Sequence, residues 1–415
     1  MKYPALAEVL AKIKPSKIEG QNVKRAISDF ISKLNHNLKG AKAILGGSGA
    51  KGTWLAPGFD VDIFVCYDYK RFAGKSSELS SMLEPVIKRT FKAYKRIHGS
   101  RDYFRTQFRG FTFELVPILA IKKASEAINI MDISPLHAIW VKRKIGKKAD
   151  EIRLAKAFCK AQGVYGAESH ISGFSGYVCE ILTIYYGSFL SLLQASKKWK
   201  PGTLVDIEHK LKGTRPERSL NIEKLKSPLI VIDPVQKERN AAAALSKERF
   251  EQFRLAARNF LSKQSEIYFV KQQVTIESLK HAAKGRLFIF KVGLLEEKDD
   301  VACCKALKAL EYIRTKLEQN DFSIVRSGSA FQQESLLWLE VAEKQLSPKK
   351  EIIGPPLAIA SHLMPFKKEH PNFYERDERL YAQVRRKYTK PEALVKAVMK
   401  DKQVSERLKT IILVQ

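Results

Sequence analysis

The stretch Gly46–Phe64, GGSGAKGTWLAPGFDVDIF, indicates the fold more clearly than any other part of the chain. It places Asp60 and Asp62 one residue apart in an apolar run that is typical of a strand. Because successive side chains on a strand point to opposite faces, we expect both aspartates on one face and Val61 and Ile63 in the core. Two carboxylates on one face repel each other unless a cation lies between them.

A third acid, Glu114, lies in the later apolar run FTFELVPIL and is expected on a neighbouring strand. Hard ions such as Mg²⁺ bind carboxylate oxygens, waters and substrate phosphates. Three acids of this kind can hold two Mg²⁺ ions, which activate an attacking hydroxyl and stabilise a leaving pyrophosphate. The pattern therefore predicts a two-metal centre, with a solvated acidic edge as the alternative.

The glycine-serine turn before the aspartates is a candidate phosphate site. Glycines let the backbone approach a ligand, and N–H groups at the start of the next segment point at anions. We expect Gly47 and Ser48 to hold the β- and γ-phosphates of a nucleotide, with Lys51 nearby as a countercharge. A glycine hinge that binds nothing is the alternative.

The composition favours a large protein with a polyanionic partner. A chain of 415 residues is too long for one core, so two to four domains are expected. Lys and Arg number 74 against 44 Asp and Glu, a net charge of +30. This excess causes self-repulsion in the folded state, which a nucleic-acid partner would relieve. Adaptation to an unusual cytoplasm is the alternative.

The cysteines and the hydropathy favour a soluble, cytoplasmic protein. The cysteines are odd in number and show no CxxC spacing, which argues against a disulfide framework or a cysteine zinc site. The first residues predict an amphipathic helix rather than a signal peptide. No apolar run approaches the ~18–20 residues that cross a bilayer. The cysteines are Cys66, Cys159, Cys179, Cys303 and Cys304.

The periodicity divides the chain into three parts. Residues 1–142 begin with helices and continue with strand, helix and strand, which predicts a small mixed sheet with helices on one side. Residues 143–262 are mostly helical. Residues 263–415 read strand, long helix, strand, strand, which is half of a ferredoxin-like unit, and close with a basic loop and helix. The expected elements are helices within 1–40, strands at 41–45, 61–69 and within 108–121, a helix over 80–97, helices over 150–166, 175–196 and 247–263, a strand at 285–295, a helix over 301–322, strands within 323–343, and loop then helix over 374–400.

The order of turn, acid-x-acid strand and later acid strand resembles the polymerase-beta-like nucleotidyltransferase superfamily. Further blocks are similar to the archaeal, class I CCA-adding enzymes, which are tRNA nucleotidyltransferases. The resemblance is densest from about 44 to 260 and continues more thinly through the tail. The blocks are SPLHAIWV, DEIRLAKAFCKAQGVYGAE, SGFSGYVCEILTIYYGSFL, DPVQKERNAAAALS, GPPL and YAQVRRKYTKPEAL.

The resemblance implies an α+β multidomain fold. Residues 1–142 would form the nucleotidyltransferase palm, a mixed sheet with helices. Residues 143–262 would form a helical central domain that binds the nucleotide base and the tRNA end. Residues 263–415 would form a C-terminal tRNA-binding domain with a ferredoxin-like α/β tail.

The resemblance also assigns roles to single residues. Asp60, Asp62 and Glu114 match the metal-binding catalytic acids, although the family pattern is Glu-x-Asp followed by Asp. The longer third side chain changes where the oxygen of the general base lies. Ser172 stands where an arginine is expected, which would weaken one anion contact.

Other matching positions contact the nucleotide in the family. They are Ser48, His137, Lys156 and Tyr165 for the triphosphate, and Arg239 for the edge of the incoming base. Each has a plainer alternative. His137 could cap a helix, Lys156 could be solvated, Tyr165 could be core, and Arg239 could pair only with Asp233.

The closing segment carries a cluster of basic residues that suits an RNA partner. A duplex acceptor arm is recognised through phosphates, 2′-hydroxyls and shape. A solvated basic helix is the alternative. The candidates for tRNA binding are Arg376, Arg379, Arg385, Arg386, Lys387 and Lys390.

The sequence thus predicts template-independent addition of CCA to the 3′ end of tRNA from CTP and ATP, with two Mg²⁺ ions. The sequence does not give the oligomeric state, although the resemblance allows a homodimer because family members are often dimers. One alternative is a poly(A)-polymerase-like or oligoadenylate-synthesising enzyme. The other is a tRNA-binding protein that has lost its chemistry.

Overall fold

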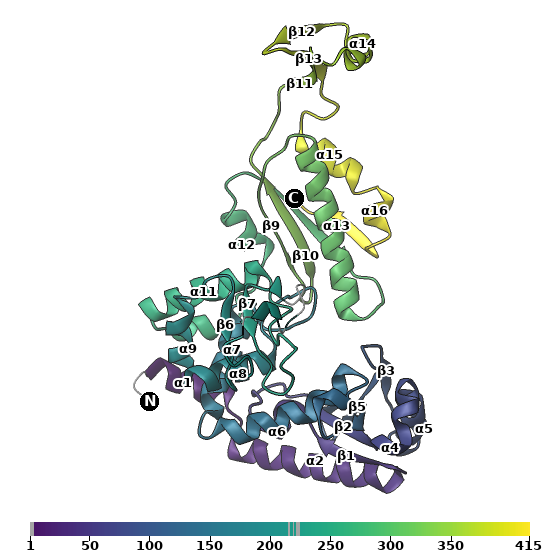
Figure 1. Cartoon of the computed structure of the whole chain (residues 1–415), viewed down its shortest axis with the longest axis vertical. Helices are drawn as coiled ribbons and strands as arrows, with labels where there is room; N and C mark the ends of the chain where they lie inside the picture. Colours follow the sequence, from purple (N-terminus) through teal and green to yellow (C-terminus); the bar gives the residue numbers. More distant parts are fainter. Residues whose placement is uncertain (1–3, 215, 219, 221–224) are drawn as a thin grey trace. The chain divides into compact units, whose positions relative to one another are not determined.

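The computed structural model describes residues 4–214, 216–218, 220 and 225–415. The chain forms two compact units, Met1–Gln272 (unit 1) and Gln273–Gln415 (unit 2), which we describe separately. Figure 1 shows their helices and strands in sequence colours.

Unit 1 contains a five-stranded mixed sheet in the order β1-β2-β5-β4-β3. Strands β2 and β5 are parallel, and the other neighbours are antiparallel. The predicted mixed sheet and its three predicted strands are confirmed. The strands are β1 Ala41–Leu45, β2 Val61–Asp68, β3 Lys95–Ile97, β4 Tyr103–Phe108 and β5 Phe111–Ala120.

The helix expected over residues 80–97 is wrong in its second half. Helix α5, Leu79–Thr90, ends before Phe91, which adopts an extended backbone and stacks on Phe30 at 4.5 Å. The chain then forms β3, an edge strand that pairs with β4. Short edge strands rich in Lys and Arg carry little hydrophobic alternation, so the sequence pattern gave no signal for β3.

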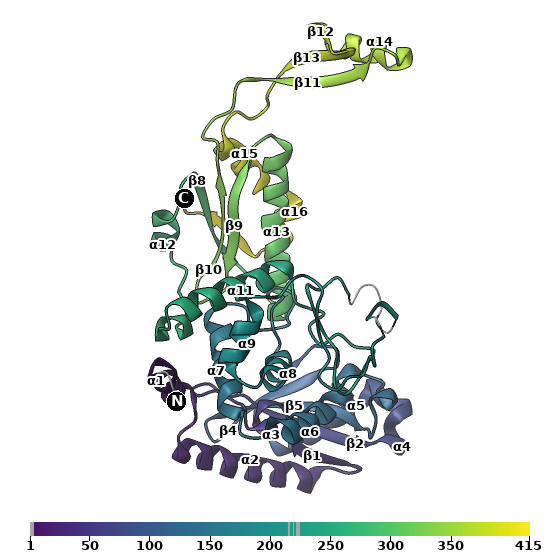
Figure 2. The same ribbon diagram turned by 60° about the vertical axis from the view of Figure 1, so that its left-hand side comes forward.

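Helices α2 and α5 cover one face of the sheet (Figure 2). Helix α2, Lys17–Asn37, begins with a capping box between Ser16 and Glu19, which satisfies two free backbone N–H groups. Phe30 of α2 packs at 3.9 Å on Phe113 of β5 in the core below the sheet. A smaller apolar cluster on the opposite face includes Phe64, Val116 and Ile118.

The remainder of unit 1 is built around buried helices. The predicted run over 175–196 forms two helices, because Gly187 has φ +90° and Ser188 caps the second one. Phe158 lies at the centre, and the rings of four other phenylalanines surround it. The elements are α1 Pro4–Ile13, α3 Gly47–Lys51, α4 Tyr69–Phe72, α6 Ser134–Ile145, α7 Ala149–Ala161, α8 Gly176–Tyr186, α9 Phe189–Ser196, α11 Lys247–Ser262, and the parallel pair β6 Thr203–Val205 and β7 Leu229–Val231.

In the part of the chain that the structure describes, no single helix is long and apolar enough to cross a membrane. Helices α8 and α9 pass that test only as a pair bent by 92°. Their apolar side chains are part of the core of unit 1.

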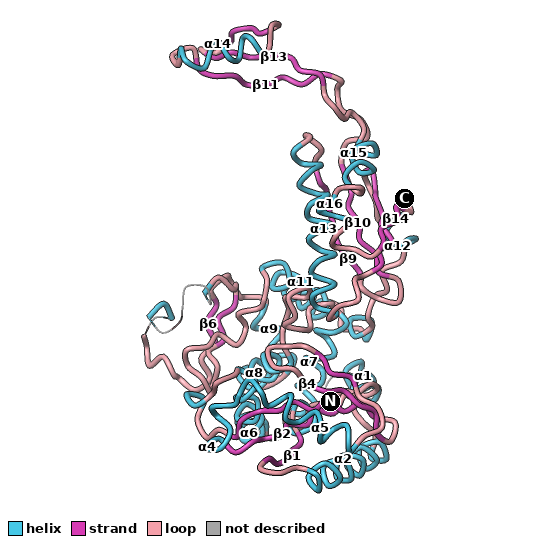
Figure 3. Tube along the Cα trace, turned by 90° about the vertical axis from the view of Figure 1, so that its right-hand side faces the viewer, coloured by secondary structure: helices cyan, strands magenta, loops and turns pink. Residues whose placement is uncertain are grey.

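Unit 2 contains a four-stranded antiparallel sheet in the order β14-β8-β10-β9. The long helix α13 lies along strands β9 and β10 (Figure 3). The predicted strand, helix, strand, strand order is confirmed. The elements are α12 Ile276–His281, β8 Arg286–Gly293, α13 Asp299–Gln319, β9 Ile324–Ala330, β10 Ser335–Val341, α15 Pro391–Val398, α16 Lys402–Ser405 and β14 Thr410–Leu413.

The basic segment expected as a loop forms two strands before its helix. Strands β12, Phe373–Arg376, and β13, Arg379–Arg385, join β11, Lys349–Pro356, in a three-stranded sheet that carries α14, Ala360–Glu369. Asp377 and Glu378 form the turn with φ values of 50° and 57°. Such tight hairpin turns normally use Asn or Gly, so the sequence ERDER did not predict one.

Candidate active site

Asp62 and Glu114 are direct neighbours on parallel strands β2 and β5. Val61 and Ile63 are fully buried, which confirms the predicted alternation of β2. Asp60 is exposed and lies just before the strand, because β2 begins at Val61, so the expectation that the strand carries both aspartates is wrong for Asp60. The sheet thus holds two of the predicted acids in register, and the adjoining loop carries the third.

The three acids interact electrostatically. Burial raises the pKa of Asp62 to about 6, and the negative charges of Glu114 and Asp60 act in the same direction. Lys51 and Lys156 oppose this effect only in part. The Asp62 carboxyl group loses its proton less readily than an ordinary aspartate, because its negative charge is poorly compensated. A hard cation such as Mg²⁺ would compensate that charge, and carboxylate oxygens are ligands that it prefers.

The side chain of Glu114 is held by Arg105, its antiparallel neighbour on β4. The Nε and Nη2 atoms of Arg105 donate to Oε1 of Glu114 at 3.0 and 2.6 Å. Among the described residues, no three His, Cys, Asp or Glu side chains are gathered closely enough to enclose a metal ion. The carboxylate oxygens of the three acids are thus suitable ligands for Mg²⁺. Glu114 is oriented by Arg105, which the sequence did not indicate because strand β4 was not predicted.

The glycine-serine turn lies directly against Asp62. The N–H of Gly46 donates to the backbone oxygen of Asp62 at 2.8 Å. Gly47 has φ +51°, and a Cβ atom there would lie 1.7 Å from Oδ2 of Asp62. Ser48 follows at partial exposure. The predicted phosphate turn and the predicted acid strand are therefore adjacent in space.

Lys51 and Lys156 share one buried carboxylate, that of Glu180 on α8. The Nζ atoms of Lys51 and Lys156 donate to Oε2 and Oε1 of Glu180 at 2.6 and 2.7 Å. The hydroxyl of Thr53 also donates to Oε1 at 2.7 Å. Lys156 is 3% exposed, so the plainer alternative of a solvated lysine is wrong.

Burial and charge pairing oppose each other in the ionisation of this cluster. Burial lowers the pKa of Lys156, although the charge of Glu180 opposes the shift. For Glu180, burial opposes ionisation, but Lys156 and Lys51 outweigh it and lower the pKa. Sequence reasoning missed Glu180; the available signal was a single acid within the apolar helix YVCEILTIYY.

A second buried carboxylate, Asp233, gathers His137, Tyr177 and Arg239. His137 Nε2 lies 3.1 Å and Arg239 Nη1 2.6 Å from Oδ2, while the Tyr177 hydroxyl donates to Oδ1 at 3.2 Å. Burial opposes ionisation of Asp233, but His137 and Arg239 lower its pKa to about 2. The predicted alternative for Arg239, a pair with Asp233, is present as a contact.

The structure contradicts the plainer alternative for His137, a helix cap, and agrees with the one for Tyr165, a place in the core. The N-cap position of α6 is Ile133, so His137 does not cap that helix; its ring stacks on Tyr177 at 4.1 Å. Tyr165 packs against the core of unit 1, and burial raises the pKa of its hydroxyl. The Nζ atom of Lys160 lies 5.2 Å from the Tyr165 ring.

Helix α8 connects the two carboxylate clusters. It carries Tyr177 and Glu180 one turn apart, and Lys51 Nζ lies 6.0 Å from the centre of the Tyr177 ring. Segments far apart in sequence therefore supply neighbouring groups: the glycine turn, α6, α7, α8 and the loop at residues 233–239.

Ser172 lies in a turn with φ +53°, and its hydroxyl donates to the oxygen of Ser169 at 2.7 Å. Arg249 of α11 reaches the same turn and donates from Nε to the oxygen of Ile171 at 3.0 Å. An arginine is thus present beside this turn although Ser172 replaces the expected one.

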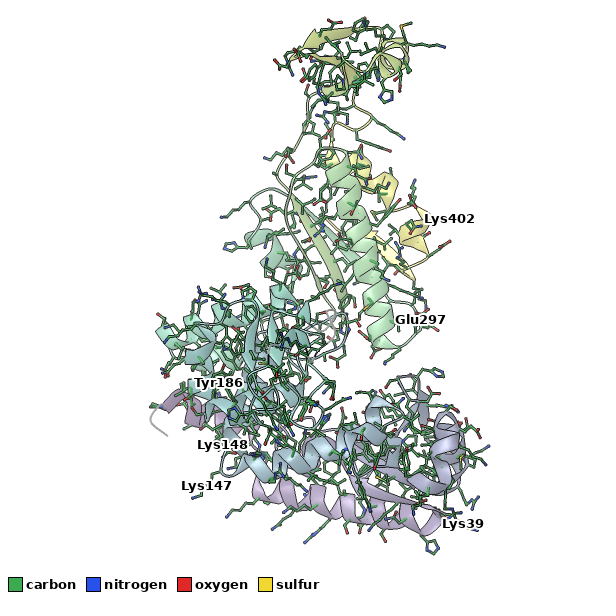
Figure 4. The ribbon with its side chains drawn as sticks, in the orientation of Figure 1. Lys39, Lys147, Lys148, Tyr186, Glu297 and Lys402 are labelled. Atoms are coloured by element: carbon green, nitrogen blue, oxygen red, sulfur yellow. The ribbon has the colours of Figure 1, made fainter. Side chains whose placement is uncertain are left out.

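Arg376, Arg379 and Arg385 lie on β12 and β13, Arg386 and Lys387 lie in the segment after β13, and Lys390 is the N-cap of α15, so the alternative of a solvated basic helix is wrong for these residues. Three have protein partners: Arg376 pairs with Glu351, Arg386 with Asp321, and Arg379 donates to Gly354 O. Arg385, Lys387 and Lys390 are exposed. Other exposed lysines, such as Lys39 and Lys147, point to solvent from unit 1 (Figure 4).

Two families match long parts of the chain. Residues 150–270 match the second domain of tRNA nucleotidyltransferases, and residues 298–413 match the C-terminal domain of CCA-adding enzymes. A solved structure of Cid1, an RNA terminal uridylyl transferase, covers 65% of this chain and 98% of its own with a TM-score of 0.50 and 12% identity. That likeness concerns the fold alone.

Relatives match along nearly the whole chain. The CCA-adding enzyme of Nanoarchaeum equitans is 34% identical and covers 90% of this chain and 92% of its own. That of Sulfurisphaera tokodaii is 31% identical over 93% of this chain and 90% of its own, and that of Methanocaldococcus jannaschii 29% over 92% and 88%. The chain belongs to the archaeal, class I family of CCA-adding enzymes.

Proposed function

We propose that the chain carries out the CCA addition of its family by nucleotidyl transfer from CTP and ATP, with Asp60, Asp62 and Glu114 around the reacting atoms. The observation that carries this proposal is the register of Asp62 and Glu114 on parallel strands, directly beside the turn at Gly47. Transfer breaks the bond between the α- and β-phosphates and joins the α-phosphate to the 3′-oxygen of tRNA.

Asp60, Asp62 and Glu114 would hold two Mg²⁺ ions. Bound Mg²⁺ would supply activation of the 3′-hydroxyl and stabilisation of the leaving pyrophosphate. The raised pKa of Asp62 supports this assignment, because burial and its acidic neighbours leave its charge poorly compensated within the protein. Glu114 would also accept the proton of the 3′-hydroxyl.

The residues beside the acids would bind the nucleotide. Gly47 and Ser48 would contact the β- and γ-phosphates. Lys51 and Lys156, which Glu180 holds in position, would offset the negative charge of these phosphates. His137 and Tyr165 would line the same region.

Arg239 would read the edge of the incoming base, because its planar fork of donors suits a base edge. The pair with Asp233 uses its Nη1 atom and fixes the direction of the guanidinium.

Unit 2 would bind the acceptor arm of tRNA. Arg385, Lys387 and Lys390 are exposed and suit phosphate contacts, with Arg376, Arg379 and Arg386 beside them. The order β14-β8-β10-β9 supports a ferredoxin-like assignment for its sheet.

The chain would consist of three domains, with boundaries 1–142, 143–262 and 263–415. It would form a homodimer and act in the cytoplasm.

Incorporation of labelled CTP and ATP into tRNA that lacks its terminal CCA tests the proposal. We expect two C and one A per tRNA, and loss of incorporation in Asp62→Ala with tRNA affinity retained. Wild-type activity in Asp62→Ala would overturn the assignment of the acids. Transfer of ATP alone to many RNAs would instead indicate a poly(A)-polymerase-like enzyme.

A further inference from the structure

The contact between Arg105 and Glu114 is made to a single oxygen of the carboxylate. Both donor atoms of Arg105, Nε at 3.0 Å and Nη2 at 2.6 Å, meet the same oxygen, Oε1. Within the described part of the chain, no hydrogen bond to the other oxygen, Oε2, is observed. The two residues are cross-strand neighbours on β4 and β5, so the sheet fixes the distance between their Cα atoms.

The pair is poorly suited to stabilise the fold. The Arg105 side chain is 46% exposed, and exposed ion pairs contribute little to stability because water screens them. A positioning role accounts better for its geometry. Glu114 has three rotatable side-chain bonds, and without a partner its carboxylate would occupy several positions. An arginine fork restricts such a carboxylate to one orientation.

The position of Arg105 relative to the other acids adds to this argument. The negative charges of both Glu114 and Asp60 act on the Arg105 guanidinium. One cation therefore lies within electrostatic reach of two of the three acids. The Cα atom of Glu114 is also in register with that of Asp62 on its other side.

We propose that Arg105 is a positioning residue for the nucleotidyl transfer, which fixes Oε1 of Glu114 and leaves Oε2 to act on the metal and the 3′-hydroxyl. This inference rests on the proposed role of Glu114. Arg105 would thereby place the carboxylate of Glu114 where the shorter side chain of an aspartate would place its own carboxylate without a partner.

A double-mutant cycle between Arg105→Gln and Glu114→Asp tests the proposal. In the Glu114 background we expect Arg105→Gln to lower kcat about tenfold or more and to raise the Mg²⁺ concentration needed, with the KM for CTP and ATP within about twofold. In the Glu114→Asp background the same change should alter kcat by no more than about twofold, because the shorter carboxylate no longer depends on Arg105.

Arg96→Gln is the matched control. Arg96 lies on the neighbouring strand β3 and pairs with Glu84 and Asp102, so its loss removes half-buried arginine pairs that do not involve the three acids. We expect unchanged kcat in Arg96→Gln, and midpoints of thermal unfolding within about 2 °C of the wild type for both arginine variants. Arg105→Lys, which keeps the charge without the fork, should have an intermediate kcat.

The outcomes separate the inference from the proposal beneath it. Wild-type activity in Glu114→Ala would overturn the proposed role of Glu114 itself. An inactive Glu114→Ala with equal effects of Arg105→Gln in both backgrounds would overturn the positioning role alone. Higher activity or a lower Mg²⁺ requirement in Arg105→Gln would also overturn it, because Arg105 would then compete with the metal.

Discussion

Gly47 and Asp62 approach so closely that a Cβ atom on Gly47 would lie 1.7 Å from the Oδ2 atom of Asp62. The backbone of Gly47 also has φ +51°, a conformation that favours glycine. The protein's own carboxylate therefore requires a glycine at this position. The turn and the acid strand form one structure rather than two adjoining motifs.

Replacing Gly47 by alanine should abolish CCA addition, because the new methyl group displaces the Asp62 carboxylate. Gly52→Ala is the control, since Gly52 also has positive φ (+67°) but has open space where a Cβ would stand. We expect Gly52→Ala to lower the free energy of unfolding by about 1 kcal/mol and to keep most activity. Equal loss of activity in the two variants, measured as incorporation of labelled CTP, would contradict the predicted clash.

Asp62→Asn should inactivate the enzyme and yet stabilise the metal-free protein at neutral pH. Folding raises the pKa of Asp62 from 3.8 to about 6, so the folded state favours the protonated carboxyl. That stability is present below pH 4 and is lost as the pH rises through 6. We therefore expect the free energy of unfolding of Asp62→Asn to exceed that of the wild type by about 2–3 kcal/mol at pH 7.5, and the two values to be nearly equal at pH 4.

Denaturant unfolding in a chelator, repeated with Mg²⁺, measures this effect. Added Mg²⁺ should stabilise the wild type and leave Asp62→Asn almost unchanged, because the proposed ligand is lost. Asp60→Asn, at an exposed position, is the control for removing a neighbouring acid without the burial. A variant Asp62→Asn no more stable than the wild type at pH 7.5 would refute the prediction.

Glu180→Gln should be strongly destabilising, because it leaves two buried ammonium groups without their shared anion. Removing one partner of a buried ion pair costs about 3–5 kcal/mol. The KM for CTP and ATP should rise as Lys51 and Lys156 lose their positions. Glu208→Gln is the control: Glu208 accepts from Trp140 and Lys144 but is 21% exposed, so a cost near 1 kcal/mol is expected. Equal stability of the two variants would show that Glu180 is not the anchor of the cluster.

Protonation of Asp233 should lower the stability of the fold at acid pH. Its pKa is lowered from 3.8 to about 2, so its ionised form stabilises the fold above pH 4 and this contribution is lost as the pH falls towards 2. Asp233→Asn should unfold with about 2 kcal/mol less free energy at neutral pH, and the difference should shrink as the pH falls below 4. Thermal unfolding from pH 6 to pH 3 measures the difference, and a gap that does not narrow would contradict the assignment.

Changing Arg385, Lys387 and Lys390 together to glutamine should weaken tRNA binding and leave the KM for CTP unchanged. Each lost phosphate contact should reduce the slope of log affinity against log salt by about 0.7–0.9. The control replaces Lys308, Lys400 and Lys402, which are also exposed in unit 2. An equal reduction of the slope in both triple variants would indicate general charge rather than a binding surface.

The parts that sequence predicted are those with a local signal. Alternating apolar residues identified β2 and β5, and regular spacing identified α2, α7 and α13. The edge strand β3 and the hairpin of β12 and β13 carry charged residues and an atypical turn, so their pairing depends on neighbours distant in sequence.

The same reason explains which site residues were found. Asp60, Asp62 and the glycine turn form a short motif that a single sequence can reveal. Arg105 depends on the unpredicted strand β4, and Glu180 lies 129 residues after Lys51. Only the three-dimensional contacts show that these residues belong to the clusters.

Because Glu180 on α8 supplies the counter-ion of Lys51 in the glycine turn, the order of synthesis constrains when the site can form. A ribosome releases the turn and the acid strands long before it releases α8. During that interval Lys51 lacks its carboxylate and Lys156 of α7 is not yet buried beside it. The Lys51–Glu180 pair, and with it the proposed nucleotide site, can therefore form only after α8 has been synthesised and has docked.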